Sequence, residues 1–257
     1  FLYHTAALMA ANAGFARLTR AAPDHRRAFD ARTLVEALGE SGAAGAVPAA
    51  AIELKVPAFS DAPAVLPVEV ASAIPRTDAI AVFIDRNPFP YIARFEFSAD
   101  CTPYAAFRAR IAESSVLRVV AFAGDTRHGV AKQVQASAGA CSADDAEAPE
   151  YPVPPPPIRA RAQSEGEGAL VRALLRHPME NGLRRLANGA PIPERYIQRF
   201  DVRLNGRTVL SAQFGRSMSQ DPLIGFRLVR AKPGDALELR WQDSHGVVRS
   251  DVVVVSA

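Results

Sequence analysis

The chain has 257 residues, which is enough for one large domain or for two of ordinary size. Apolar residues make up 49% of it, so a sizeable core can form. The net charge is +3, and residues 166–257 hold 14 Lys/Arg against 9 Asp/Glu, a surplus of +5 that leaves −2 for the rest. This basic half lacks Lys/Arg clusters interleaved with aromatic residues, which argues against a nucleic-acid partner.

Motifs of a self-contained active site are also missing from the sequence. The two cysteines, Cys101 and Cys141, are too few for a disulfide framework and lack metal-ligand spacing. The histidines are dispersed, and no Gly-x-Ser-x-Gly elbow, phosphate loop or dinucleotide fingerprint is present. We therefore expect no metal site, no cofactor and no catalytic centre of the chain's own.

Residues 1–22 form a short, alanine-rich apolar run. It is too short to span a bilayer, and it resembles the apolar region and small-residue cleavage site of an export signal. The usual basic region is missing, and a sequence that opens on Phe1-Leu2 resembles a twin-arginine signal cut just after its arginine pair. We expect residues 1–27 to be the remnant of such a signal and the protein to be periplasmic. An ordinary amphipathic helix is the alternative.

The following segment changes from helical to strand periodicity. Residues 30–39 predict a short helix, with Asp30 as N-cap, Leu34, Val35 and Leu38 on one face, and Gly39 as the stop. Short alternating runs between turn signals then predict antiparallel strands. These runs cover residues 52–56, 65–72, 80–85, 91–97, 104–111, 117–122 and 130–137.

A thiol on an arm of small residues follows the last of these strands. Residues 137–143 read Ser-Ala-Gly-Ala-Cys-Ser-Ala, so Cys141 lies among residues too small to build a core. Such a thiol suits covalent carriage of a group, although a cysteine that merely lies in a linker is the alternative. The acidic and proline-rich residues 142–168 predict a semi-rigid polyproline II spacer between two domains.

A second all-β pattern begins after this spacer. It predicts strands at residues 170–175, 197–204, 208–214, 224–228, 237–242 and 247–255, and Asn205-Gly206 is a strong two-residue hairpin signal. Trp241 is expected in the core. The fold predicted is all-β: two immunoglobulin-like antiparallel sandwiches, at residues 28–141 and 169–257, with a short helix at the N-terminus and a Pro-rich linker at 142–168.

Several runs resemble the two subunits of a known sulfur carrier. Residues 79–97, AIAVFIDRNPFPYIARFEF, resemble the central part of SoxY, and residues 177–184, HPMENGLR, resemble the opening of SoxZ. Further runs similar to SoxZ are residues 192–193, 196–198, 209–215, 217–222 and 226–235. As a whole, the chain resembles a SoxY–SoxZ fusion of the quinoprotein dehydrogenase-associated SoxYZ-like type.

The resemblance implies a non-catalytic, exported carrier without a cofactor. In that family a cysteine in a Gly-Gly-Cys-Gly-Gly arm holds sulfur intermediates covalently during thiosulfate oxidation. Cys141 aligns with that cysteine, and Gly139 keeps one arm glycine, whereas Ala140 and Ser142 depart from the pattern. The implied partners are periplasmic sulfur-oxidation enzymes or a quinoprotein dehydrogenase system, together with pairing of the SoxY-like and SoxZ-like parts within the chain.

Two departures from the family pattern bear on the chemistry. The arm continues into a second domain, so two segments of the chain must enter a partner's channel together. The partner's channel must therefore have a wider mouth, or the cargo must differ from that of the family. Asp144, Asp145 and Glu147 follow the thiol closely, and nearby carboxylates raise the pKa of a thiol. We therefore hypothesise that Cys141 is unreactive alone and becomes activated inside a partner's site.

The second cysteine and the remaining function classes leave alternatives open. Cys101, in an Asp-Cys-Thr-Pro turn, is expected to be half-exposed, or else to form a disulfide with Cys141 that stops carriage. A non-covalent scaffold for a quinoprotein dehydrogenase is the alternative to a carrier. A thiol peroxidase or transferase is disfavoured, because the sequence fixes no base near Cys141, although His128 could approach it in space.

Overall fold

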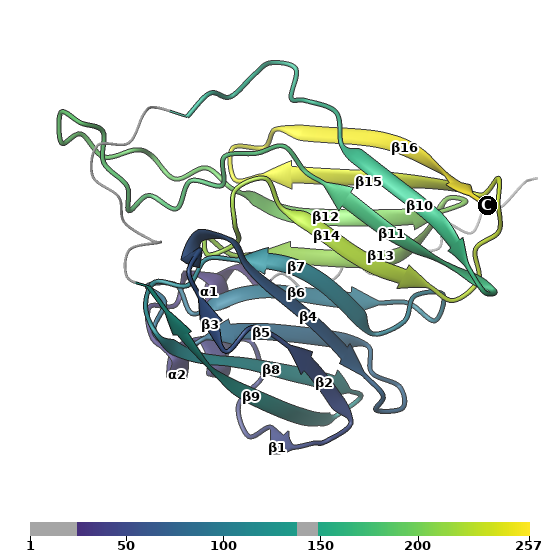
Figure 1. Cartoon of the computed structure of the whole chain (residues 1–257), viewed down its shortest axis with the longest axis horizontal. Helices are drawn as coiled ribbons and strands as arrows, with labels where there is room; N and C mark the ends of the chain where they lie inside the picture. Colours follow the sequence, from purple (N-terminus) through teal and green to yellow (C-terminus); the bar gives the residue numbers. More distant parts are fainter. Residues whose placement is uncertain (1–24, 138–148) are drawn as a thin grey trace, which may run out of the picture.

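The computed structural model describes residues 25–137 and 149–257, and it confirms an all-β protein. Two short helices, α1 (Arg26–Asp30) and α2 (Leu34–Glu40), and a 3-10 turn, η1 (Pro63–Val65), accompany the strands (Figure 1). No helix in the described ranges is long and apolar enough to cross a lipid bilayer.

Each strand predicted for the first half of the chain is present, within a few residues at its ends. Two further strands of two residues each, β1 and β3, join the edge of the sheet beside β9. The first-half strands are β1 (Val47–Pro48), β2 (Ile52–Lys55), β3 (Phe59–Ser60), β4 (Leu66–Ser72), β5 (Ala79–Ile84), β6 (Tyr91–Phe97), β7 (Tyr104–Ala109), β8 (Ser115–Ala123) and β9 (Thr126–Ala136).

The second half contains one strand that the sequence did not predict. That strand, β10 (Arg159–Glu165), lies within the expected linker, and it has a single fully buried residue, Ala162. The predicted Asn205-Gly206 hairpin is confirmed, since both residues have positive φ, 48° and 81°. The other strands are β11 (Gly168–Leu174), β12 (Ile197–Leu204), β13 (Arg207–Phe214), β14 (Leu223–Leu228), β15 (Ala236–Asp243) and β16 (Val248–Ser256).

The two halves are joined into one continuous path of strands, which differs from the two separate sandwiches that the sequence predicted. The order is β1-β9-β8-β5-β6-β13-β12-β15-β16-β10-β11-β14-β7-β4-β2. The halves meet twice along it, where β6 pairs with β13 and where β14 pairs with β7. In Figure 1 the strands β2, β4, β7, β14, β11 and β10 form the near layer, and it runs across both halves. Periodicity could not reveal this, because it does not say which strands pair.

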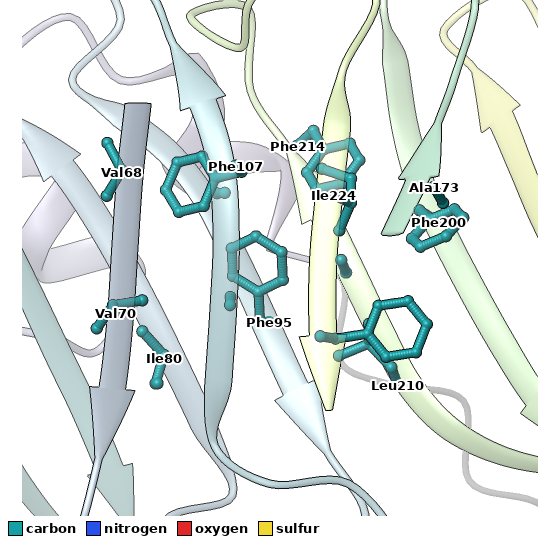
Figure 2. Close-up of a cluster of buried hydrophobic side chains, with 14 of the residues drawn as sticks. Val68, Val70, Ile80, Phe95, Phe107, Ala173, Phe200, Leu210, Phe214 and Ile224 are labelled. Carbon is teal, nitrogen blue, oxygen red and sulfur yellow. The ribbon is translucent and has the colours of Figure 1, made fainter. Parts of the chain in front are cut away.

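One hydrophobic core fills the space between the layers on both sides of this junction. A row of aromatic rings crosses it, with Phe95 and Phe107 from the first half beside Phe214 and Phe200 from the second (Figure 2). The ring centroids of Phe95 and Phe107 lie 5.3 Å apart, and those of Phe200 and Phe214 lie 6.5 Å apart. Because large aromatic side chains dominate core energetics, the two halves stabilise each other.

The N-terminal helices pack on the outer face of β5, β6 and β8, and they correct one prediction. Asp30 ends α1 and does not cap the next helix; Thr33 caps α2, where its Oγ1 accepts a hydrogen bond from Glu36 N at 3.3 Å. The carboxylate of Asp30 instead accepts from Arg216 Nη1 at 2.7 Å. The first-half helices are therefore tied to the second half of the chain.

Candidate functional site

The candidate carrier residue, Cys141, and the arm residues Gly139, Ala140 and Ser142 lie outside the described residues. The described chain ends at Ser137 on one side of the arm and resumes at Pro149 on the other. The structure therefore defines the two anchors of the arm, which set where its thiol can reach.

The first anchor is the end of β9. Its strand pairs with β8 along nine residues and with the short strand β3 at its end. Ser137 N donates to Ser60 O at 3.1 Å, and Ser137 Oγ donates to Asp61 O at 3.3 Å. Ala136 N donates a third hydrogen bond, to Ser114 Oγ at 3.0 Å. The chain is thus held firmly up to four residues before Cys141.

The second anchor is Tyr151, which lies two residues after the described chain resumes. The guanidinium of Arg195 lies 4.1 Å from the centre of its ring, a cation–π contact. Burial raises the pKa of Tyr151 to about 12, so its hydroxyl keeps its proton. Farther along, Ile158 N donates to Asp251 Oδ2 at 2.8 Å, at the entry to β10. The arm therefore has a fixed end on this side as well.

A buried histidine supports the second anchor. His177 packs edge-on against Tyr151 and Trp241, with centroids 6.0 Å and 5.7 Å away. Its Nδ1 accepts from Met179 N at 3.0 Å, so in the neutral ring the proton is on Nε2. Burial lowers the pKa of His177 to about 4, although Asp243, 3.6 Å from Nε2, opposes the shift. His177 is therefore neutral near pH 7, which suits a structural role.

Asp243 completes this group of residues from the end of β15. Its Oδ2 accepts from Arg195 Nε at 2.7 Å, and its Oδ1 accepts from the amides of His245 and Val247. Although burial opposes it, these donors hold the pKa of Asp243 below its usual value. In the sequence, His177 stands out only as part of the family resemblance. Its partner Asp243 is 66 positions away, so no local sequence pattern predicts the contact.

Both anchors lie at the same end of the sheets. In the first half, Ser115 pairs with Val134 near Ser137, and Ala123 pairs with Thr126 at the opposite end. In the second half, Leu174 pairs with Leu223 near His177, whereas Ala169 pairs with Leu228 at the opposite end. Cys101 forms a bridge with Leu228, so it lies at that opposite end.

The structure corrects one of the two interpretations of Cys101 made from the sequence. Cys101 is only 3% exposed, and burial raises the pKa of its thiol to about 12. The nine-residue strand β8, about 30 Å long, separates the two ends of the sheet. Four residues from Ser137 to Cys141 reach about 14 Å at most. Cys101 is therefore buried and not half-exposed. A disulfide with Cys141 would require the arm to reach the opposite end of the sheet, and it stays a prediction.

The described ranges contain no group of three or more His, Cys, Asp or Glu side chains that could hold a metal ion. His128 lies within β9 opposite Ala121, at the Ala123 end of the strand pair and away from Ser137. It is therefore remote from the first anchor of the arm.

Comparisons with known proteins agree with the two-part organisation. The family model "Sulfur oxidation protein SoxY" matches residues 38–141, and "Sulphur oxidation protein SoxZ" matches residues 158–254. The search of the curated proteins gave no match.

Two solved structures are among those that match the chain. The sulfur carrier protein SoxY from Chlorobium limicola f thiosulfatophilum is 30% identical, with 39% of this chain and 96% of that chain covered and a TM-score of 0.35. A beta-glycosidase from Bacteroides vulgatus is 12% identical, with 79% of this chain and 24% of that chain covered and a TM-score of 0.26.

SoxY and SoxZ are non-catalytic sulfur carrier proteins of sulfur oxidation. Here their two parts share strand pairing and a core within a single polypeptide. The chain belongs to the SoxY and SoxZ sulfur-carrier family, with a SoxY domain followed by a SoxZ domain.

Proposed function

We propose that the protein holds a sulfur-containing intermediate covalently on Cys141 and presents it to partner enzymes. The observation that carries the proposal is the position of the SoxY match, whose last residue is Cys141. The remaining cysteine, Cys101, is buried and has a raised thiol pKa, so it is unsuited to carriage. Gly139, Ala140 and Ser142 supply the small neighbours that give a partner access to the thiol.

The anchors limit how the cargo is presented. Cys141 lies four residues after Ser137 and ten before Tyr151, so the shorter tether limits its reach to about 14 Å from Ser137. The arm enters a partner as a loop with two strands. A partner enzyme therefore needs a catalytic centre that is shallow and wide-mouthed, which distinguishes this carrier from one with a free C-terminal arm.

The acidic residues after Cys141 favour a thiol of low reactivity until a partner enzyme binds the carrier. Asp144, Asp145 and Glu147 stabilise the protonated thiol, because a thiolate beside carboxylates is electrostatically disfavoured. We expect the rate of alkylation of Cys141 to keep rising above pH 8. A rate that is already maximal well below neutrality would contradict this part of the proposal.

The compartment and pathway belong to the same proposal. Residues 1–24 are outside the described ranges, and we propose that they are the remnant of an export signal and that the carrier works in the periplasm, with sulfur-oxidation enzymes or a quinoprotein dehydrogenase system. The signal, predicted over residues 1–27, would on this proposal end earlier, before His25, because His25 N donates to Gln213 Oε1 at 3.2 Å and Arg26 Nη1 donates to Phe214 O at 3.1 Å. These contacts join the start of the folded chain to the SoxZ domain.

A radiolabelling experiment separates carriage from a non-covalent scaffold role. Cells that produce the protein are given ³⁵S-thiosulfate, and the purified protein is analysed with and without dithiothreitol. We expect label on the wild type that dithiothreitol releases, none on Cys141→Ser, and unchanged label on Cys101→Ala. A chain that stays unlabelled while Cys141→Ser supports sulfur oxidation as well as the wild type would contradict carriage and favour the scaffold.

A further inference from the structure

A groove crosses the junction of the two domains at strands β4, β7, β11 and β14. It has a volume of about 590 Å³ and lies where β7 pairs with β14. Two small residues, Ala106 and Gly225, face each other there, and a Cβ on Gly225 would lie 3.2 Å from that of Ala106. Its apolar lining includes Pro57, Pro67 and Leu223.

Four cationic side chains surround this apolar lining, and we call the whole the basic groove. They are Lys55, Arg108, Lys132 and Arg172, against a single acidic residue, Glu69. Lys55 pairs with Glu69 at 3.4 Å. The other three are exposed, and none has a side-chain hydrogen bond or ion pair with any described residue. An excess of unpaired positive charge beside apolar surface complements an anionic partner.

The basic groove lies beside the first anchor of the arm. Pro57 adjoins Ala58, whose carbonyl oxygen accepts from Gln135 N at 2.8 Å, next to the bond between Ser60 and Ser137. Lys132 lies five residues before Ser137 on β9, about 16 Å along the strand. An enzyme that acts on Cys141 must approach Ser137 within the reach of the arm. A standard interface covers about 800 Å² per partner, a disc of about 16 Å radius, so its footprint reaches the groove.

We propose that the basic groove is the docking surface for an acidic face of the enzyme that processes the group on Cys141. The inference rests on the proposed function for the identity of the partner. Lys55, Arg108 and Lys132 belong to the SoxY domain, and Arg172 belongs to the SoxZ domain. A partner that contacts all four cationic side chains therefore binds the assembled pair of domains, and it does not bind either domain alone.

The test uses fluorescein-labelled poly-L-glutamate as the acidic probe and follows its anisotropy with the full chain at low ionic strength. Arg108→Glu/Arg172→Glu is expected to weaken binding at least ten-fold. The matched control is Lys232→Glu/Arg240→Glu, which changes the charge equally at two exposed residues outside the groove. It is expected to weaken binding less than two-fold. Circular dichroism of each variant establishes that it is folded.

The outcomes separate this proposal from its alternatives. Equal weakening by both double variants means that the probe senses only net charge, and it overturns the proposal. Binding that appears only after Asp144→Asn/Asp145→Asn/Glu147→Gln would show that the chain's own acidic residues occupy the groove, and it also overturns the proposal. Cys141→Ser should bind the probe like the wild type, so a failure of sulfur loading on Cys141 is distinguishable from a failure of docking.

Discussion

The ring of Phe95, in β6 of the SoxY domain, meets the ring of Phe214, in β13 of the SoxZ domain, edge-on with centroids 6.1 Å apart. Their strands are also hydrogen-bonded neighbours, with Ala212 opposite Phe95. Fusion keeps the two domains together at a high effective concentration, which favours formation of this contact between their cores. A core that passes through the junction makes the domain pair a single structural unit.

We predict that both domains unfold together. Phe214→Ala should lower the free energy of unfolding by about 3–5 kcal/mol, because it removes a fully buried ring from the shared core. Urea unfolding followed by Trp241 fluorescence, which reports the SoxZ domain, should coincide with unfolding followed by circular dichroism, which reports both. Separate midpoints for the two signals would show that the core does not couple the domains.

Close backbone approach at the junction predicts opposite effects of alanine at two glycines. Gly215 N donates to Ile92 O at 2.8 Å, and a Cβ at this position would overlap Tyr91 O and lie 2.9 Å from Phe29 Cδ1. Gly215→Ala should therefore cost about 1–3 kcal/mol. A Cβ at Gly39, in α2, meets nothing within 4 Å, so Gly39→Ala should raise the free energy of unfolding by up to about 1 kcal/mol. Thermal unfolding compares the two, and equal effects would contradict the close approach.

The buried His177 predicts a loss of stability in mild acid. Its folded-state pKa is lowered to about 4, whereas in the unfolded chain it is near 6.5. The unfolded state therefore binds the proton first as the pH falls, and stability is lost between pH 6.5 and 4, by up to about 3 kcal/mol. His177→Asn should flatten this part of the curve of urea midpoint against pH. The same slope in wild type and variant would assign the effect to other groups.

The two thiols should differ sharply in reactivity. In the folded protein, iodoacetamide at pH 8.5 should modify Cys141, whereas Cys101 should react only after unfolding, because its thiol is buried and its pKa is about 12. Mass spectrometry should find one modification per native chain and none on native Cys141→Ser. Rapid modification of Cys101 in the folded protein would mean that the loop holding it opens readily.

Much of the strand content could be predicted from the sequence because it depends on local patterns. The alternation in β12 and the turn residues Asn205-Gly206 predict the β12–β13 hairpin to within a residue of its observed bounds. Strand β10 was missed, because its residues are mostly polar and only Ala162 is fully buried. The sequence predicts Asp30 as a helix cap because aspartate suits that position, but Arg216, far away in sequence, binds its carboxylate.

The site was less predictable, since it depends on contacts between distant residues. The candidate cysteine followed from its small neighbours and from the family resemblance. The second anchor did not, because Tyr151, His177, Arg195 and Asp243 come from four separate segments. The burial of Cys101 could not be predicted either, since an Asp-Cys-Thr-Pro turn gives no indication that the residue pairs with Leu228 of β14 and is buried.

The most direct test of the carrier account is mass spectrometry of the protein purified from its native cells under non-reducing conditions. We predict a dithiothreitol-sensitive mass increase that maps to Cys141, with Cys101 unmodified. The peptide containing Cys141 should carry one or more additional sulfur atoms when the cells oxidise sulfur compounds. An unmodified Cys141 under every growth condition would contradict covalent carriage.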